Sequence, residues 1–429
     1  MTDAPAARPS EFSRAYTNYA LGLLLAVFVV NFLDRQVVAI LLQAIKLDLG
    51  LSDTQLGAFS GIAFAALYST LGIPLARWAD RGVRRSIIAL ALLVWSGMTA
   101  LQGFAPSFFW LIAARVGVGI GEAGCTPPAH SLIADLFEPR RRATALAIYS
   151  LGIPLGGAIG LAGGGWLRET FDWRTALMIV GLPGLGLALL VRLTLREPTR
   201  GWWEGGRAAE TPPSLSDVAR VLRARSSFVH MAFAGALHAL YGYGAGTFLP
   251  IFFERVHRLP PLEIGYSLGA IAASAGVLGT FLGGWLTDRV SGRDMRWYAW
   301  LPALGTGIYI PCAFVLYLWP DPRGALALAV LPALVAGLHL GPTFAIAQAL
   351  VPPQMRAQAA AVLLLILNLV GMGLGPQLVG LLSDLLAPRF GAESIRWALL
   401  GTIVAGASWS IVHYALAART LREDLRANA

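Results

Sequence analysis

Apolar stretches of about 20 residues recur along almost the whole chain and are separated by short polar breaks. A helix of that length crosses the ~30 Å hydrocarbon core of a bilayer, and a helix satisfies its own backbone hydrogen bonds in lipid. The pattern therefore predicts an all-α membrane protein with twelve transmembrane helices, at residues 16–42, 54–78, 84–104, 108–136, 141–167, 173–195, 226–254, 262–290, 295–319, 322–350, 354–386 and 394–418.

A polar segment between the sixth and seventh predicted helices divides the chain into two halves. It contains Glu197-Pro198, Gly205-Gly206 and Pro212-Pro213 together with many arginines, a composition typical of a solvated linker. We therefore predict five parts: a cytoplasmic tail (1–15), an N-terminal six-helix bundle (16–195), a cytoplasmic linker (196–225), a C-terminal six-helix bundle (226–418) and a second cytoplasmic tail (419–429).

Arginines are concentrated in alternate loops, and short loops rich in arginine stay on the cytoplasmic side of a membrane. The opposite loops carry fewer basic residues. Both termini are therefore predicted to be cytoplasmic, on the side that holds the linker arginines and Arg81, Arg84, Arg85, Arg140, Arg141, Arg142, Arg289, Arg293, Arg296, Arg356, Arg419, Arg422 and Arg426.

The composition agrees with a protein whose main solvent is lipid. Of 429 residues, 56% are hydrophobic and 13% are charged, which excludes a water-soluble domain of this length. The net charge of +9 does not indicate nucleic-acid binding, because the arginines lie in short loops rather than on one face. Cys125 and Cys312 lie inside apolar runs and predict no disulfide framework. The first apolar run is too long for the core of a signal peptide, so we expect a retained helix.

Four charged residues lie within predicted helices rather than at their ends. Asp34 and Arg35 are near the middle of the first helix, and Arg115 and Glu122 are in the fourth. A charge at this depth costs between about 2.5 and more than 10 kcal/mol, so it persists only when it is paired or functional. The spacing of Arg115 and Glu122 is close to two helical turns, which places both on one face, roughly 10 Å apart.

Two interpretations of these charges are open. In the first, they are structural ion pairs, Asp34 with Arg115 and Arg35 with Glu122, that hold two helices together. In the second, Asp34 and Glu122 take up and release protons, while Arg35 or Arg115 holds an anionic head group, since a guanidinium matches phosphate or carboxylate. The two interpretations are compatible if the ion pair is one state of a transport cycle.

A loop signature occurs twice, after the second helix of each predicted half. The copies are Ala76-x-x-x-Asp80-Arg81-Gly82-Val83-Arg84-Arg85 and Gly284-x-x-x-Asp288-Arg289-x-x-Gly292-Arg293. The chain here resembles the major facilitator superfamily, whose loop motif is Gly-x-x-x-Asp-Arg-x-Gly-Arg-Arg; Ala76 departs from it. The resemblance implies two bundles that rock about a central cavity, with the first and fourth helices lining it. Gating is the role expected for Asp80, Arg81, Arg85, Asp288 and Arg289.

The second half has no arginine, lysine or carboxylate in the middle of a predicted helix. One wall of a central cavity would then be charged and the other apolar, which favours a solute with an ionic head and an apolar tail. His238 and Tyr241 lie in a glycine-broken stretch of the seventh helix and are candidates for substrate binding. The alternative for His238 is a core histidine with satisfied hydrogen bonds.

A closer resemblance covers mainly the first half. Asn31 to Arg35, Gly50-Leu51-Ser52-Asp53-Thr54-Gln55, Arg115-x-x-x-Gly119-x-Gly121-Glu122-Ala123, Pro127-Pro128 and Ala134-Asp135-Leu136-Phe137 are similar to the Spinster family. That family transports sphingoid phosphates and lysophospholipids, with proton-linked bacterial members. Asp34, Arg35, Arg115 and Glu122 fall on its charged cavity residues. Organic-anion symporters and multidrug/proton antiporters of the same superfamily are the alternatives.

The prediction is thus a proton-coupled secondary transporter of an amphipathic, anionic-headed, lipid-like solute. We expect no enzymatic activity, no cofactor, no metal and no nucleic-acid partner, and we expect a monomer in the bilayer. Lys46 is the single lysine among 33 basic residues, which suggests a GC-rich bacterial genome and hence the bacterial inner membrane.

Overall fold

The computed structural model describes residues 11–203 and 214–426, and within them the secondary structure is entirely helical. The first half consists of helices whose bounds are α1 Arg14–Leu49, α2 Asp53–Gly57, α3 Ala63–Arg81, α4 Arg84–Gln102, α5 Phe108–Ala123, α6 Thr126–Leu136, α7 Pro139–Ser150, α8 Gly152–Thr170 and α9 Trp173–Thr194. A π-helical turn, Ala58–Ile62, joins α2 to α3. The segments α5–α6 and α7–α8 each form one broken helix.

The second half begins with a short helix and continues with long, broken ones. Its bounds are α10 Leu215–Ala224, α11 Ser226–Arg255, α12 Pro261–Ile271, α13 Val277–Ser291, α14 Trp297–Leu318, α15 Pro322–Leu328, α16 Val330–Ala336, α17 Leu340–Ala349, α18 Arg356–Ile366, α19 Gly375–Phe390 and α20 Ser394–Arg426. π-helical stretches at Ala272–Gly276 and Leu367–Leu374 join α12 to α13 and α18 to α19.

Local sequence explains where several helices begin and end. Ser13 caps α1 by accepting a hydrogen bond from the Tyr16 amide, and Gly50 ends it with a φ of 63°. Ser52 and Gln55 form a reciprocal capping box at the start of α2. The Asp172 carboxylate caps α9 by accepting from the Thr175 amide. These polar residues therefore mark the ends of the predicted apolar runs.

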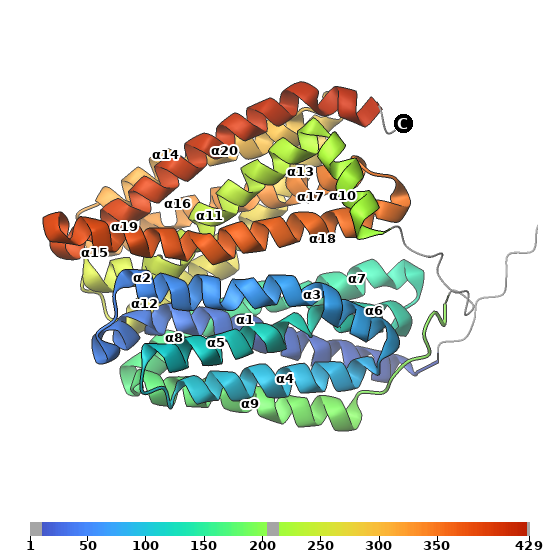
Figure 1. The fold of residues 1–429 in the computed structure, drawn as a ribbon, viewed down its shortest axis with the longest axis horizontal. Helices are drawn as coiled ribbons and strands as arrows, with labels where there is room; N and C mark the ends of the chain where they lie inside the picture. The colour runs from blue at the N-terminus through green and yellow to red at the C-terminus, as the bar shows by residue number, and fades with distance from the viewer. Residues whose placement is uncertain (1–10, 204–213, 427–429) are drawn as a thin grey trace, which may run out of the picture.

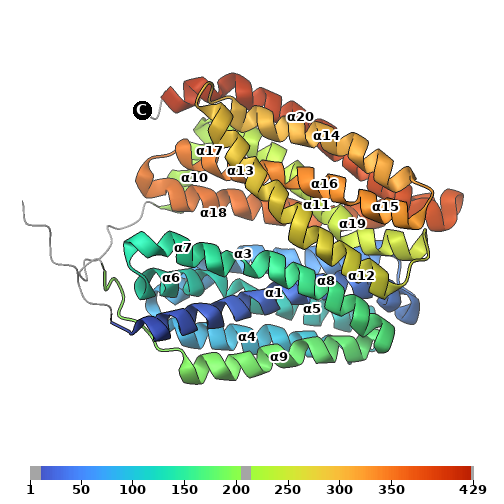
Figure 2. The ribbon, with the colours of Figure 1, turned by 180° about the vertical axis from the view of Figure 1, so that it is seen from behind.

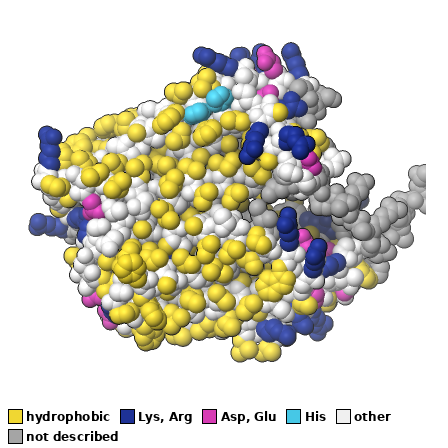
Figure 3. Space-filling view, viewed as in Figure 1, with side chains coloured by type: hydrophobic (Ala, Val, Ile, Leu, Met, Phe, Trp, Pro, Cys, Tyr) yellow, Lys and Arg dark blue, Asp and Glu magenta, His cyan; other side chains and the backbone are white. Residues whose placement is uncertain are grey.

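The helices run back and forth between two ends of the molecule (Figures 1 and 2). We call the end that holds Arg14, Leu195 and Arg426 the terminal end, and the end that holds Gly50 and Gly391 the distal end. Figure 1 shows α1 to α9 together in the lower part and most of α11 to α20 in the upper part, with α12 reaching down beside the first half, so the two halves of the sequence are also two halves in space. Figure 3 shows hydrophobic side chains over the middle of the surface and charged ones toward both ends, as a lipid-facing surface requires.

Among the described residues, nine helices are long and apolar enough to cross a membrane, or ten if the pair Asp53–Gly72 and Pro74–Arg81, bent by 43°, is counted as one span. The sequence predicted twelve. Residues Gln358–Arg426 count as one apolar segment, although the chain reverses inside it at Gly391, whose φ is 55°. Helix α11, which contains glycine and histidine residues, is not among the helices that are apolar enough to count as a span.

The predicted tails and linker differ in part from the structure. Helix α20 continues to Arg426, so most of the expected second tail is helical, because its buried Leu421 packs with the core of the second half. Residues 215–224 of the expected linker form α10, whose Val218 and Leu222 are buried in the same core. Residues 1–10, 204–213 and 427–429 lie outside the described part; they include Gly205-Gly206 and Pro212-Pro213 of the linker.

Candidate functional site

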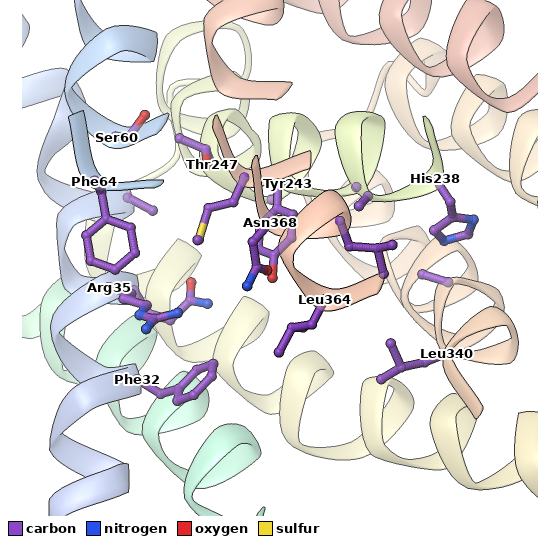
Figure 4. Close-up of a pocket in the computed structure, with 18 of the residues that line it drawn as sticks. Phe32, Arg35, Ser60, Phe64, His238, Tyr243, Thr247, Leu340, Leu364 and Asn368 are labelled. Atoms are coloured by element: carbon purple, nitrogen blue, oxygen red, sulfur yellow. The ribbon is translucent and has the colours of Figure 1, made fainter. Parts of the chain in front are cut away.

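A cavity of about 440 Å³ lies between the two halves (Figure 4). Residues of α1, α3, α5 and the π-helical turn before α3 form one wall, and residues of α11, α16, α17 and α18 with their adjoining turns form the other. Its lining combines aromatic and aliphatic side chains with a few polar groups, and comprises Phe32, Arg35, Gln36, Val38, Ala39, Ser60, Phe64, Arg115, His238, Ala239, Gly242, Tyr243, Gly246, Thr247, Ala336, His339, Leu340, Phe344, Leu364, Leu367, Asn368 and Met372.

Arg35 presents the charged group that reaches farthest into this cavity from α1 (Figure 4). Its Nε and Nη2 lie 2.7 and 2.6 Å from one oxygen, Oε2, of the buried Glu122. Its guanidinium also lies over the rings of Phe64 and Tyr68, with centroid distances of 4.8 and 4.5 Å. Arg35 is therefore held by a carboxylate and by aromatic faces together.

Arg115 is the second guanidinium of the cavity wall. It is 3% exposed and stacks against Phe59 and Phe64. Its nearest carboxylate is Asp34, with Nη1 and Oδ2 4.0 Å apart, and Thr99 donates a hydrogen bond of 3.0 Å to the same oxygen. Nε and Nη1 of Arg115 have no hydrogen-bond partner. These donors are available to an anion that enters the cavity.

The structure brings together all four charges that the sequence singled out. They pair as the structural interpretation proposed, Arg35 with Glu122 and Arg115 with Asp34, but the pairing is incomplete. Oδ1 of Asp34 and Oε1 of Glu122 also have no hydrogen-bond partner, although both residues are buried. Leaving a buried charge without all its hydrogen bonds costs free energy, which a purely structural cluster would avoid. The arrangement therefore favours the second interpretation, in which these four side chains change their hydrogen-bond partners.

The two candidates on α11 differ in their positions. His238 lines the cavity, whereas Tyr241 does not: it is fully buried behind His238 and its hydroxyl lies 2.7 Å from His238 Nδ1. Tyr241 packs against Tyr309, which closes it off from the cavity. Tyr243, two residues further along the helix and on its opposite side, lines the cavity instead (Figure 4). Tyr241, which the sequence singled out, therefore does not line this cavity, whereas Tyr243 does.

The wall of the second half is more polar than the sequence suggested. Tyr243, Thr247, His339 and Asn368 accompany His238 in the lining, while the remaining residues on this side are small or apolar. The expectation of no mid-helix arginine, lysine or carboxylate agrees with this lining, but neutral hydrogen-bonding groups are present. His339 and Asn368 were not predicted, because each stands alone in an apolar run and carries no sequence signal of its own.

A polar cluster around Asp53 joins the two halves at the distal end. Asp53 is 2% exposed and accepts hydrogen bonds from Arg255 at 2.6 and 2.8 Å, from Lys46 at 2.5 Å and from Ser383 at 2.6 Å. Arg255 also donates to Gln43. One carboxylate therefore connects α1 and α2 of the first half with α11 and α19 of the second. We call these residues the Asp53 cluster.

Two further polar contacts lie beside the Asp53 cluster. Asp384 accepts hydrogen bonds from the backbone amides of Asp53 and Thr54, which are the first residues of α2, at 3.0 and 2.7 Å. Arg168 of α8 pairs with Glu254 of α11 at 2.7 Å. The sequence did not predict these contacts between the halves. In the sequence Asp53 is simply a residue at the start of a helix, and its partners are distant in the chain.

Close backbone packing continues the distal closure. A Cβ atom on Gly57 would lie 2.5 Å from the Pro376 carbonyl oxygen, and one on Gly165 would lie 2.5 Å from that of Pro261. Any residue larger than glycine would force these helices apart. We call these contacts the glycine seam. In the described residues, the hydrogen bonds and ion pairs between the two halves lie at the distal end, and together with the glycine seam they close the cavity on that side.

The expected gating residues lie at the terminal end. Asp80, Arg81, Asp288 and Arg289 are exposed, and in the described part of the chain none of them forms an ion pair between the halves. Their role in gating therefore stays a prediction. Arg85 donates to the Leu195 carbonyl and its amide to Glu197. The neighbouring Arg84, fully buried, binds Glu197, Asp135 and Ser131 within the first half.

The described residues contain no group of three histidine, cysteine, aspartate or glutamate side chains that could hold a metal ion.

Comparison with known proteins agrees with this arrangement. The family model described as Major Facilitator Superfamily matches residues 24–376. An "MFS-type efflux pump" of Mycolicibacterium smegmatis is 34% identical over 419 residues, covering 95% of this chain and 94% of that protein. "Protein spinster homolog 1" of Homo sapiens is 29% identical, covering 85% and 72%. The "Sphingosine-1-phosphate transporter SPNS2" of Mus musculus is 28% identical, covering 83% and 68%.

A solved structure is similar over almost the full length. The crystal structure of a bacterial homologue of the human lysosomal transporter Spinster, in an inward-facing and unoccupied conformation, superposes with a TM-score of 0.87 at 34% identity. The match covers 96% of this chain and 99% of that one. The nucleoside transporter NupG, at 13% identity and a TM-score of 0.74, shares the fold alone.

Proposed function

Because this chain belongs to the Major Facilitator Superfamily, and is a Spinster-like membrane transporter rather than an enzyme, we propose that it moves an amphipathic, anionic-headed solute by proton-coupled alternating access. The observation that carries the proposal is the cavity wall itself, where Arg35 and Arg115 meet Glu122 and Asp34 with unused donors and acceptors. The relative whose name specifies sphingosine 1-phosphate supports a lysophospholipid or sphingoid-phosphate type of substrate.

We propose that the chain crosses the membrane twelve times. The twelve stretches are α1, α2–α3, α4, α5–α6, α7–α8, α9, α11, α12–α13, α14, α15–α17, α18–α19 and α20. The reversal at Gly391 supports counting α19 and α20 separately. With the terminal end in the cytoplasm, as the arginine distribution favours, a cavity closed at the distal end is open toward the cytoplasm. The bundles 16–195 and 226–418 then rock against each other within one monomer in a bacterial inner membrane.

The charges suggest how protons and solute exchange. When Glu122 takes up a proton, its attraction for Arg35 falls, and the guanidinium becomes free to bind an anionic head group. Protonation of Asp34 acts on Arg115 in the same way. Release of the proton restores the internal pairs and expels the anion. The apolar part of the solute lies against Phe32, Leu364 and Met372 of the lining.

The gating residues complete the cycle in the opposite state. With the distal end open, the terminal end must close, and we propose that Asp80 and Asp288 then meet basic partners across the two halves. Arg81, Arg85 and Arg289 lie at the same end and supply those charges. In the described part of the chain, Asp80 and Asp288 form no ion pair between the halves, which supports an open gate in this conformation.

A pH gradient provides the direct test of proton coupling. In proteoliposomes loaded with a lysophospholipid or a sphingoid phosphate, imposing a pH gradient should accelerate transport, and collapsing it with a protonophore should return the rate to that without a gradient. Transport that ignores the gradient and follows sodium instead would refute the proposal. The direction that accelerates flux distinguishes symport from antiport.

Removing Arg115 should weaken binding of anionic solutes selectively. Arg115→Ala deletes charge-assisted hydrogen bonds worth about 1.5–3 kcal/mol, so affinity for an alkyl phosphate should fall at least tenfold, roughly, while affinity for the corresponding alkyl alcohol stays unchanged. Titration calorimetry on both ligands measures the difference. Arg174→Ala, which removes an arginine that pairs with Asp48 at the distal end of the same half, is the matched control.

The alternative is a multidrug/proton antiporter, which the similarity to a mycobacterial efflux pump favours. In that case cationic dyes rather than alkyl phosphates should stabilise the purified protein in a thermal-shift screen. An organic-anion symporter should instead be stabilised by sugar phosphates. The response to these ligand classes therefore separates the three candidates.

A further inference from the structure

A pair of stacked imidazoles forms part of the cavity wall that the second half contributes. The rings of His238 in α11 and His339, which follows α16, have centroids 3.6 Å apart at an interplanar angle of 25°. Both residues line the cavity, and His238 is 3% exposed. Two imidazolium rings at this distance would repel each other strongly in a low-dielectric wall, so the rings are not both charged. In the described residues, no acidic side chain is an interaction partner of either ring.

The backbone is shaped to present His339. The helix that comprises α16 and α17 is interrupted by a 3₁₀ turn, Gly337–His339, at this position. Thr343, in the first turn of α17, donates a hydrogen bond of 2.7 Å from its hydroxyl to the His339 carbonyl oxygen. Interruptions of this kind in membrane helices are tolerated where the backbone lines a cavity. The turn is therefore a local feature that places one imidazole beside another.

Hydrogen bonding defines the free edge of each ring. Nδ1 of His339 lies 2.7 Å from the Ala336 carbonyl oxygen, which only accepts, so Nδ1 carries the proton and Nε2 of the neutral ring is an acceptor. Nδ1 of His238 is occupied by the hydroxyls of Tyr241 at 2.7 Å and Thr306 at 3.2 Å, both of which can donate or accept. The nitrogen left to His339 thus requires a donor, whereas the His238 ring also hydrogen-bonds the Ala336 backbone and its Nε2 lies 3.5 Å from the Tyr241 hydroxyl.

Arg35 and His238 lie at opposite ends of the cavity, with Leu364 between them (Figure 4). We propose that His238 and His339 form a second binding subsite that accepts a hydrogen bond from a hydroxyl group of the solute, separated from its anionic head by an apolar segment. The hydroxyl group donates to His339 Nε2, and the stacked His238 ring holds the His339 ring in position. This subsite rests on the proposed function, since it assumes that the cavity holds an anionic-headed solute.

The test uses three alkyl phosphates of equal chain length that end in a methyl, a hydroxyl or a methoxy group, in hexyl, octyl, decyl and dodecyl series. Calorimetric titration of the full-length protein should show, for at least one length, that the hydroxyl compound binds about fivefold or more tightly than the other two. Methoxy accepts but cannot donate, so equal binding of hydroxyl and methoxy compounds would overturn the assignment. This comparison needs no variant.

A variant then locates the effect. His339→Phe keeps a ring to stack on His238 but removes the acceptor, so the hydroxyl preference should disappear while affinity for the plain alkyl phosphate stays within about twofold. The control is His413→Phe. His413 in α20 pairs with His230 in α11 outside the cavity lining, so this variant should keep the hydroxyl preference. A preference that survives in His339→Phe would overturn the subsite. If the unaltered protein binds no alkyl phosphate, the proposed function fails; binding without hydroxyl preference refutes only the subsite.

Discussion

Glu122→Gln is expected to give a folded protein that binds its solute but no longer couples transport to a pH gradient. Glutamine has the shape of a protonated glutamate and cannot release a proton. Arg35 keeps an oxygen partner and its contacts with Phe64 and Tyr68, so the free energy of unfolding should fall by only about 1–3 kcal/mol. The pH-driven flux should drop to that of protein-free vesicles.

Three measurements separate this outcome from a structural role: melting temperature, ligand affinity and pH-driven flux. If Glu122 only anchored Arg35, its removal would cost about 3–5 kcal/mol and the variant should be visibly unstable. The matched control is Glu393→Gln, which removes the carboxylate paired with Arg396 near the distal end and should transport normally. A Glu122→Gln protein that is stable and fully competent in pH-driven transport would end the proposed mechanism.

Asp53→Asn is expected to open the distal end. The substitution removes the negative charge that Arg255 and Lys46 share, and each charge-assisted hydrogen bond contributes about 1.5–3 kcal/mol. The bonds that Arg255 and Ser383 make with Asp53 exist only while the two halves meet there, so weakening them should shift the ratio of distal-open to distal-closed molecules by at least about tenfold. Transport should fall, since the protein returns less readily to the conformation described.

Distances between spin labels measure this shift. Leu47 in α1 and Leu385 in α19 are exposed at the distal end of different halves, at 71% and 67%, and can be changed to cysteine once Cys125 and Cys312 are replaced by serine. The long-distance population should grow in the Asp53→Asn protein. Asp172→Asn, an exposed cap within one half, should leave the distribution unchanged. An unaltered distribution in Asp53→Asn would show that the cluster does not control closure.

The sequence identified the charged part of the site because its energetic cost is visible in one dimension. Asp34, Arg35, Arg115 and Glu122 interrupt apolar runs, and a charge in such a run needs a partner or a function. Their pairing could be proposed because both helices carry one charge of each sign. Which of their nitrogen and oxygen atoms lack a hydrogen-bond partner became apparent only from the structure, since a change of a few tenths of an ångström makes or breaks a hydrogen bond.

Two other features were beyond sequence reasoning. Tyr241 and Tyr243 lie on opposite faces of α11, and nothing in their neighbourhood says which face meets the cavity. The partners Arg255 and Ser383 lie 202 and 330 residues away from Asp53, so the distal closure has no local pattern. The sequence predicted α11 as a membrane span, and at 30 residues it is long enough, but it is not among the helices apolar enough to qualify as a span. The reason is that a cavity-lining helix replaces part of its apolar surface with glycine and polar residues.

The glycine seam has a consequence for the thermodynamics of the conformational cycle. Heat-capacity changes in proteins follow the apolar area that becomes exposed to water. Backbone meets backbone where Gly57 approaches Pro376 and Gly165 approaches Pro261, but buried apolar side chains of both halves, among them Leu56, Leu161, Ile264 and Val379, belong to one core around these contacts. Close approach at the glycines lets these side chains pack together, so opening the distal end should expose apolar area to water, and the free-energy difference between the two states should vary with temperature along a curve rather than a straight line.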